Sequence, residues 1–425
     1  MHHNFLTSKI SHITLKFNFV QIKNNNNKKK MTSKLSFPHS SHTPLLTLIF
    51  TLLIFLLSST LPLSSSITPP KNQSPSTRKP FSKIYAFGDS YTDTGNTISA
   101  TGPSGFNFVS NLPYGMTYFH HPTNRYSDGR LVIDFVTQTL SLPFLPAYRS
   151  TTSGGATNGV NFAVAGSTAI EHAFFVKNNL TFDVTPESLG TQLGWFNKYL
   201  AKQGGCNDPV KCGALFNDAL FWVGEIGAND YAYAAETEVS KSVIRNLAIT
   251  RVSNFLEAIL RKGAKYVVVQ GLPPTGCLTL AMYLAPTNDR DDLGCVKSVN
   301  TQSNTHNTLL QAKIQDLRKK YPKSNIIYAD YYNAYRDIMK NSKKYGFKEA
   351  FKVCCGSGGG SYNYEFFSVC GSPSAKPCPN PSQYMNWDGV HLTEAMNKVV
   401  SGLLLQGGYS HPSFQDLISK KMSQL

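Results

Sequence analysis

The sequence predicts an α/β protein in which helices cover both faces of a parallel sheet. Two observations carry this prediction: short apolar runs of strand length recur along the chain, and amphipathic segments separate them. Strands buried on both faces consist of continuous apolar runs, and their alternation with helices is typical of a parallel sheet. The five runs are Ile84–Phe87, Val160–Val164, Leu220–Val223, Tyr266–Val269 and Asn325–Ala329.

Two segments between these runs have a clear helical pattern. From Ile244 to Ile259 apolar residues recur every three or four positions, and Gly263 is expected to end that helix. A second helix ends before Pro322 and is marked by Leu309, Leu310, Ile314 and Leu317. The sequence contains no internal repeat. We expect one domain over residues 81–410, followed by a C-terminal tail over 411–425.

The N-terminal part predicts a targeting segment. Residues 1–30 are rich in Asn and Lys without apolar periodicity, which predicts an unstructured, over-called start before Met31. After Met31, Leu45–Leu57 is a 13-residue apolar stretch interrupted only by two Thr, and a Ser-rich segment follows. This order predicts a secretory signal peptide over 31–66, with a signal anchor as the alternative. The Pro- and Ser-rich segment 67–80 is expected to be a linker.

The charge is concentrated at the start of the chain. Seven lysines and no Asp, Glu or Arg fall in residues 1–70, so the rest carries +9 of the formal net charge of +16. The remaining charges are scattered and form no basic stripe or reader motif, which argues against nucleic acid as a partner. A weak affinity for acidic polysaccharide is compatible with the net charge alone.

The cysteines predict disulfides in an oxidising compartment. They number eight, all after the expected signal peptide, and none forms the C-x-x-C pair of a zinc ribbon. We expect local pairs Cys206–Cys212 and Cys277–Cys295, while Cys354 and Cys355 divide Cys370 and Cys378 between them in an order that stays open. Asn72-Gln-Ser and Asn179-Leu-Thr are glycosylation acceptors that fit the same secretory route.

A candidate nucleophile follows the first apolar run directly. Gly88-Asp89-Ser90 ends the expected strand and would deliver a hydroxyl to the carboxyl edge of the sheet, where open α/β folds place their chemistry. The tripeptide alone is also ordinary turn composition, so the assignment depends on residues far downstream.

Three later runs also lead into polar, glycine-containing segments. The second leads to Gly166, the third to Gly227-Ala-Asn229-Asp230 and the fourth to Gly271-Leu-Pro-Pro, so these residues are expected at the same edge as Ser90. A glycine lets a backbone N–H approach a ligand, and Asn229 adds an amide donor, which together can form an oxyanion hole. The alternative is that the glycines only turn the chain and Asn229 caps a helix.

A candidate base lies near the C-terminus. Asp388 and His391 are three residues apart, close enough for the carboxylate to orient the imidazole. His306 falls inside an expected helix and is interpreted as a packed or surface residue. His120-His121 has no Asp, Glu or Cys at matching spacing and is interpreted as a loop pair, so no metal site is expected.

The order of these motifs resembles the plant GDSL esterase/lipase family of the SGNH-hydrolase superfamily, over essentially all of residues 81–410. Supporting stretches are Asn124–Arg130, Gly271–Cys277 and Cys354-Cys-Gly, and the last motif, W-D-G-V-H-L-T-E-A, is similar to the branch with sinapine esterase and other acetyl esterases. The resemblance implies a flavodoxin-like three-layer α/β/α sandwich around a five-stranded parallel sheet.

Carried onto this sequence, the resemblance implies Ser90 as nucleophile, His391 as base and Asp388 as the residue that orients His391. The N–H groups of Ser90 and Gly166 and the Asn229 side chain would form the oxyanion hole. The resemblance implies no metal and no organic cofactor.

We therefore expect a secreted, extracellular serine esterase that acts on acyl or acetyl esters of lipid, phenolic or sugar alcohols. An acyltransferase with the same triad is the first alternative, and a secreted binding protein without catalysis is the second. The expected partner is a small-molecule or lipid ester, bound by a monomer that is not inserted in a membrane after signal removal. The loop-rich, aromatic regions 97–155 and 340–385 are expected to shape the mouth of the site. Within them, the aromatic loops 106–119 and 362–387 would supply either an apolar groove for long acyl chains or a surface for a sugar or a phenolic ring.

Overall fold

A computed structural model of the chain describes residues 79–103, 105–151, 157–180, 185–206, 209–235 and 237–424. The segment 1–30, the expected signal peptide 31–66, Asn72 and all but two residues of the expected linker 67–80 lie outside the described residues. Within the described ranges, no helix combines the length and the apolar character needed to cross a membrane.

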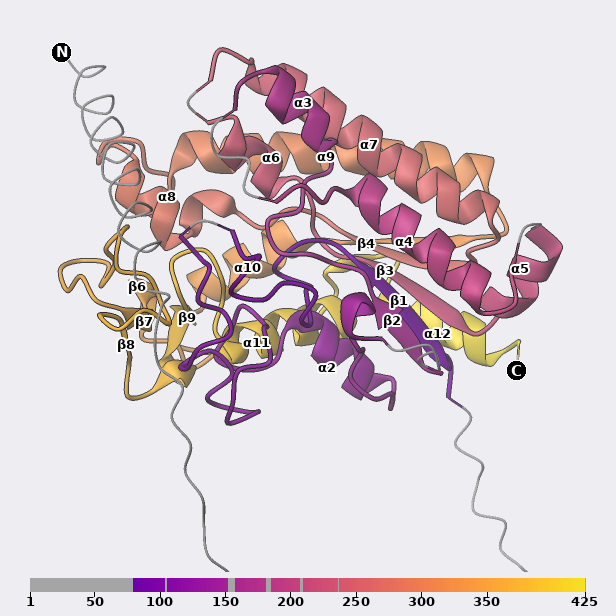
Figure 1. Cartoon of the computed structure of the whole chain (residues 1–425), viewed down its shortest axis with the longest axis horizontal. Coiled ribbons are helices and arrows are strands. Elements are labelled where there is room, and N and C mark those ends of the chain that lie inside the picture. The colour runs from indigo at the N-terminus through magenta and orange to yellow at the C-terminus, as the bar shows by residue number, and fades with distance from the viewer. Residues whose placement is uncertain are drawn as a thin grey trace, which may run out of the picture. The chain divides into compact units, whose positions relative to one another are not determined.

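The centre of the fold is a mostly parallel sheet (Figure 1). Among the residues that the structure describes, it has six strands in the order β10–β5–β4–β3–β1–β2. β10 pairs antiparallel with β5, and all other neighbours pair in parallel. The bounds are β1 (Lys83–Phe87), β2 (Gly159–Asn161), β3 (Ala219–Val223), β4 (Tyr266–Gln270), β5 (Asn325–Ala329) and β10 (Ser410–His411). Each of the five predicted runs contributes one of the parallel strands.

The second predicted strand, Val160–Val164, extends beyond the C-terminal end of the observed strand β2. β2 stops at Asn161 because side chains take over the hydrogen bonds that a longer strand would use. The Asn96 amide donates to the carbonyls of Asn161 (2.9 Å) and Ala163 (2.8 Å), and Asn161 Oδ1 accepts from Ala163 N–H. The chain nevertheless continues beside β1, where Phe162 N–H donates to Ala86 O at 2.7 Å.

Helices cover both faces of the sheet, so the fold is the expected three-layer sandwich (Figure 1). Because successive side chains of a strand point to opposite faces, Tyr85 and Phe87 lie in one core and Ile84 and Ala86 in the other. The first core includes residues of α4 (Leu189–Lys202), α5 (Pro209–Phe216), α7 (Lys241–Arg261) and α9 (Lys297–Lys320). The second includes residues of α2 (Val132–Thr139), α10 (Tyr331–Lys340), α11 (Glu394–Leu405) and α12 (Phe414–Met422).

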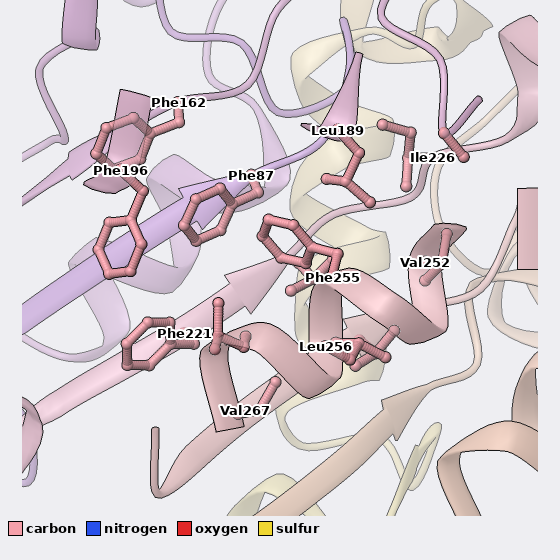
Figure 2. Packing of buried hydrophobic residues seen from close by; sticks show 14 of the residues in the cluster. Phe87, Phe162, Leu189, Phe196, Phe221, Ile226, Val252, Phe255, Leu256 and Val267 are labelled. Carbon is pink, nitrogen blue, oxygen red and sulfur yellow. The ribbon is translucent and has the colours of Figure 1, made fainter. Parts of the chain in front are cut away.

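Aromatic rings fill the first core around β1 (Figure 2). The Phe87 ring lies 5.2 Å from that of Phe162, nearly parallel to it, and 4.9 Å from that of Phe255 on α7 at a steep angle. Such offset and edge-on pairs add stability beyond the apolar area that they bury. The strand that leads to Ser90 is therefore fixed by rings from neighbouring elements.

The two predicted helices form, with one difference in the second. α7 ends at Arg261, and Gly263 follows with φ of +101°. In α9, Leu309 is 37% exposed rather than part of the core. The buried face of α9 instead begins with small polar residues and a histidine, which no apolar pattern reveals; they are Asn300, Ser303, His306 and Asn307.

The segment 411–425, expected as a C-terminal tail, contributes a strand residue and a helix to the fold. His411 belongs to β10, and α12 buries Phe414 and Leu417 against the second core. Lys421 is buried as well, and its ammonium donates to Asp218 Oδ1 at 2.5 Å. The segment folds because Phe414, Leu417 and Lys421 recur on one face of a helix.

The remaining elements are short helices and strand pairs, and a smaller third core is built mainly from loop residues. α3 (His172–Lys177), α6 (Ala228–Tyr233) and α8 (Thr279–Leu284) are short helices. β6 (Glu349–Val353) pairs with β9 (Tyr384–Asn386), and β7 (Cys355–Gly356) pairs with β8 (Lys376–Pro377). The third core joins β7 and the residues next to β6 and β9 to the 106–126 loops through Tyr114, Tyr126, Cys354, Cys355 and Trp387.

Disulfides join all eight cysteines, which are part of the described chain. The local pairs Cys206–Cys212 and Cys277–Cys295 form as expected. The order that the sequence left open is Cys354–Cys378 and Cys355–Cys370. These two bonds cross-link the third core beside β9, since Cys354 N–H and Cys355 N–H donate to the carbonyls of Asn386 and Trp387.

Candidate active site

The strand order creates a switch point beside β1. β2 lies on one side of β1 and β3 on the other, so the chain leaves the carboxyl ends of these strands in opposite directions. Ligands of open α/β sheets bind in the crevice at such a point. Ser90 follows β1, Gly166 follows β2 and Asn229 follows β3, so the structure brings these three candidates to one edge.

A tight turn presents Ser90. Gly88 has φ of +142°, and the carbonyl of Asp89 accepts from Thr92 N–H (3.0 Å) and Asp93 N–H (2.9 Å). The Asp89 side chain accepts from Tyr91 N–H at 3.1 Å, so it fixes the backbone that follows Ser90. Ser90 itself is 6% exposed. Its position is thus set by the backbone and by Asp89.

The buried Asp93 ties this turn to the Gly166 segment. Asp93 Oδ1 accepts from the N–H groups of Gly95 (2.8 Å) and Asn96 (2.7 Å), and Oδ2 accepts from Ala165 N–H at 2.9 Å. Burial raises the pKa of Asp93, and these hydrogen bonds oppose the rise. One carboxylate therefore sets the distance between the segments that follow β1 and β2.

Asp388 and His391 form a buried pair. His391 Nδ1 lies 2.8 Å from Asp388 Oδ2, and Asp388 Oδ1 accepts from the backbone N–H groups of His391 (2.8 Å) and Val390 (3.1 Å). Burial alone would raise the pKa of Asp388, but the charge and hydrogen bonds of His391 and the hydroxyl of Tyr114 hold that pKa below its ordinary value. The carboxylate therefore stays ionised and fixes the ring of His391.

Tyr91 connects the Ser90 turn to the His391 loop. Its hydroxyl donates to the carbonyl of Val390 at 2.6 Å, and its ring lies 5.8 Å from the imidazole. The rings of Tyr126 (4.6 Å) and Phe106 (5.4 Å) pack against the same imidazole. The residue after Ser90 thus holds the residue before His391, and aromatic rings surround the imidazole.

The two further oxyanion candidates face the same turn. Gly166 has φ of +78°, and its carbonyl accepts from the Tyr233 hydroxyl at 2.6 Å. Asn229 Nδ2 donates to Asp89 Oδ2 (3.1 Å) and to Ser167 O (3.0 Å), so the amide bridges the segments after β1 and β2. The alternative role of Asn229 as a helix cap is wrong, because Gly227 is the N-cap of α6.

Other residues named from the sequence lie apart from this edge. His306 is fully buried on α9, with Nδ1 at 3.0 Å from the Tyr231 hydroxyl, as a packed histidine. His120 and His121 are exposed on a loop, and within the described ranges no three His, Cys, Asp or Glu side chains are grouped so as to hold a metal ion. Asn179 is exposed.

Sequence reasoning missed Tyr114, Asp89 and Glu225 as parts of the site. Tyr114 bonds Asp388 from a loop that the sequence marked only as aromatic. Asp89 and Glu225 each follow a strand through a single glycine, in Phe87-Gly-Asp89 and Val223-Gly-Glu225. Since Phe87 pairs with Val223 in the sheet, this repeated apolar-Gly-acid ending was the signal that two acids meet.

Comparisons with known proteins match most of the chain. A family model described as GDSL-like Lipase/Acylhydrolase matches residues 84–404. A GDSL esterase/lipase of Arabidopsis thaliana is 54% identical over 392 residues, which cover 91% of this chain and 100% of that relative. Acetylajmalan esterase 2 of Rauvolfia serpentina is 39% identical over 332 residues, covering 77% of this chain and 90% of the relative. Among solved structures, a catalytic mutant of Axe2, an acetylxylan esterase from Geobacillus stearothermophilus, aligns at 12% identity with a TM-score of 0.35, over 79% of this chain and 94% of that one.

Proposed function

The chain belongs to the GDSL-like lipase/acylhydrolase family and is a carboxylic ester hydrolase, and from this premise we propose that Ser90 is its nucleophile. His391 is the general base and Asp388 orients it. The observation that carries the proposal is the buried Asp388–His391 pair, joined through Tyr91 to the turn that presents Ser90. An imidazole fixed by a carboxylate and held beside the turn of a serine supports serine acyl transfer.

The reaction proceeds in two halves. His391 Nε2 takes the Ser90 proton while Oγ attacks the ester carbonyl, and the resulting imidazolium returns that proton to the departing alcohol. Water then attacks the acyl-enzyme, with the same histidine first accepting its proton and then giving it back to Ser90. The N–H groups of Ser90 and Gly166 and the amide of Asn229 stabilise the negative oxygen in both tetrahedral intermediates.

The substrate is an acyl or acetyl ester of a phenolic, lipid or sugar alcohol. The name of the Rauvolfia relative, an acetylajmalan esterase, supports a short acyl group. The rings of Phe106 and Tyr126 against His391 support an apolar or aromatic group beside the reacting carbon. We also propose that the protein is secreted, which the four disulfides support because such bonds persist in oxidising compartments.

Hydrolysis of p-nitrophenyl acetate, butyrate and palmitate by the secreted protein tests the proposal. Ser90→Ala and His391→Ala should each remove nearly all turnover without lowering the melting temperature. Ser82→Ala is the matched control, because Ser82 is exposed just before β1, at its other end. Full activity in Ser90→Ala would contradict the proposal, and the preference among the three esters would define the acyl pocket.

Asn229→Ala tests the oxyanion role separately. Loss of one donor in an oxyanion hole typically lowers kcat by about 10²–10³-fold. We expect that loss with little change in KM, because the amide acts on the charged intermediate rather than on the bound ester. An Asn229→Ala enzyme with full kcat would remove this residue from the mechanism.

A further inference from the structure

Two strand ends bring two acids together behind Ser90. β1 and β3 pair in parallel with Phe87 opposite Val223, and each continues through one glycine into an acid, Asp89 or Glu225. Gly224 N–H donates to Phe87 O at 2.8 Å, which keeps the two chains paired beyond the strands. The register therefore places Asp89 opposite Glu225.

The two glycines make this close approach possible. A Cβ at Gly224 would overlap Thr92 Oγ1 and lie 3.0 Å from Phe87 O. A Cβ at Gly88 would lie 3.3 Å from the backbone of both Gly224 and Glu225. With no side chain at either position, the backbones approach and the two carboxyl groups meet.

The facing groups are two buried carboxyls, 1% exposed at Asp89 and fully buried at Glu225. A carboxylate only accepts hydrogen bonds, so a hydrogen bond between the two requires a proton on one partner. Asp89 accepts from Tyr91 N–H and from Asn229 Nδ2. Neither carboxyl oxygen of Glu225 has a hydrogen-bond partner in the described part of the chain.

These surroundings decide which partner carries the proton. Burial and the charge of Asp89 raise the pKa of Glu225 well above its ordinary value. Burial also raises the pKa of Asp89, to about 6, but the hydrogen bond from Tyr91 N–H and the charge of His391 limit the rise. Asp89 accepts from two N–H groups and Glu225 from none, so the hydrogen-bond geometry favours Asp89 as the anion and Glu225 as the acid.

We propose that Glu225 is a positioning residue that works in its neutral form, donating a hydrogen bond to Asp89 so that Asp89 holds the Asn229 amide and the Ser90 turn in place. This inference rests on the proposed function, because it concerns the oxyanion side of that site. Glu225 does not touch the substrate. It acts by fixing the Asp89 carboxylate, which in turn holds the Asn229 amide and Tyr91 N–H.

The groups around the pair predict how it responds to pH. Asp89, Asp230, Tyr91 and Tyr331 face Glu225, and Asp89 in turn faces His391 and Asp93. The described neighbours of Glu225 include no cation. Loss of the proton would thus place two repelling carboxylates side by side in a buried site, and Asp89 would lose its fixed orientation.

Glu225→Gln is the decisive variant, because its amide N–H can donate to Asp89 but cannot be ionised in this pH range. We expect Glu225→Ala to lower kcat by about 10- to 100-fold with little change in KM, the effect of losing one hydrogen bond to a charged group. Glu225→Gln should restore most of that loss. The wild-type kcat should fall at alkaline pH, and Glu225→Gln should lack this fall while keeping the acidic limb.

Glu257→Gln is the control for removing one carboxyl group, since Glu257 is an ion-pair partner on the opposite side of α7 from the core. It should leave kcat and the pH profile unchanged. An alkaline limb in Glu225→Gln identical to the wild type, or a loss of kcat equal to that of Glu225→Ala, would overturn the proposal.

A stability measurement separates this inference from the proposed function. A carboxyl whose pKa is raised by folding stabilises the native state at low pH, and this stability is lost as pH rises through the raised pKa. The melting temperature of Glu225→Gln relative to the wild type should therefore increase between pH 5 and pH 9. A protein that hydrolyses no ester but shows this increase would refute the proposed function and retain the acid pair, whereas a constant difference would refute the pair.

Discussion

Tyr114 donates its phenolic hydrogen to Asp388 Oδ2 at 2.7 Å, across 274 positions of the sequence. The Asp388 carboxylate therefore accepts from a side chain of the third core as well as from His391 and two backbone N–H groups. Both side chains are buried. The loop before α2 and the loop before α11 thus meet at the residue that orients His391.

Tyr114→Phe should lower kcat by about 10-fold with little effect on KM, because it removes one hydrogen bond to a charged carboxylate and leaves the ring in place. Kinetics with p-nitrophenyl acetate would measure the effect. Tyr335→Phe is the matched control, since Tyr335 is equally buried and its hydroxyl makes no hydrogen bond within the described part of the chain. Equal activity of the two variants would show that Tyr114 only packs.

Gly166→Ala should reduce kcat by about 10²-fold or more, the effect of losing one oxyanion donor. The position has φ of +78°, and a Cβ there would overlap Thr185 Oγ1 and lie 2.9 Å from Pro103 Cγ and from the Tyr233 hydroxyl. The backbone N–H must therefore move. Gly194→Ala on α4 is the control, because its Cβ would meet nothing within 4 Å and alanine favours a helix. That variant should keep full activity and melt slightly higher.

Asp128→Asn should change the pH dependence of stability. Burial raises the pKa of Asp128 to about 6, although its hydrogen bond from Glu394 N–H opposes the rise. The native protein then binds the proton more tightly than the unfolded chain, so stability from this group is present below about pH 4 and is lost as pH rises through 6. Asparagine accepts the same hydrogen bond without ionising.

Thermal melting between pH 4 and pH 8 would test this prediction. The melting temperature of Asp128→Asn relative to the wild type should rise by several degrees across the range. Asp316→Asn, exposed on α9, should show a constant difference. A falling difference for Asp128→Asn would contradict the assignment of a proton to Asp128 at low pH.

Removal of the Cys355–Cys370 bond should affect both stability and turnover. A closed loop of about 15 residues contributes roughly 3 kcal/mol by restricting the unfolded chain, and these cysteines are 15 positions apart. Because Cys355 N–H bonds the carbonyl of Trp387, the residue before Asp388, the double Ser variant should also lose kcat. Urea unfolding and esterase kinetics would measure the two effects. The Cys206/Cys212 double Ser variant, on the α4–α5 side, should lose stability alone.

Hydropathy predicted the parts of the fold in which burial and sequence pattern coincide. Each of the five parallel strands is an apolar run, and the resemblance to the family supplied the three-layer arrangement. β10 could not be found, because Ser410 and His411 have no strand pattern and pair only when α11 has placed them beside β5. The buried face of α9 was hidden for a related reason, since Asn300 and Asn307 are buried by specific hydrogen bonds to Gly276 and Leu272.

The candidate site was predictable where a motif is local and not where partners come from distant elements. Asp388 and His391 are close in sequence, and their contact followed from spacing. Tyr114 and Glu225 reach the site through tertiary contacts, and a buried acid contradicts the ordinary preference of Glu for the surface. The register of β1 and β3 is what places Glu225 opposite Asp89.

The resting contacts of Asn229 have a consequence for selectivity between ground state and transition state. An amide nitrogen carries two hydrogens, and those of Asn229 are both engaged, by Asp89 and by the carbonyl of Ser167. In the proposed mechanism, a neutral ester carbonyl is too weak an acceptor to displace either internal partner, whereas a fully developed alkoxide competes with both. The amide would then contribute almost nothing to the affinity for the ester, and most of its interaction energy would lower the activation barrier. Inhibitors that mimic the tetrahedral anion should therefore bind far more tightly than unreacted esters of the same shape.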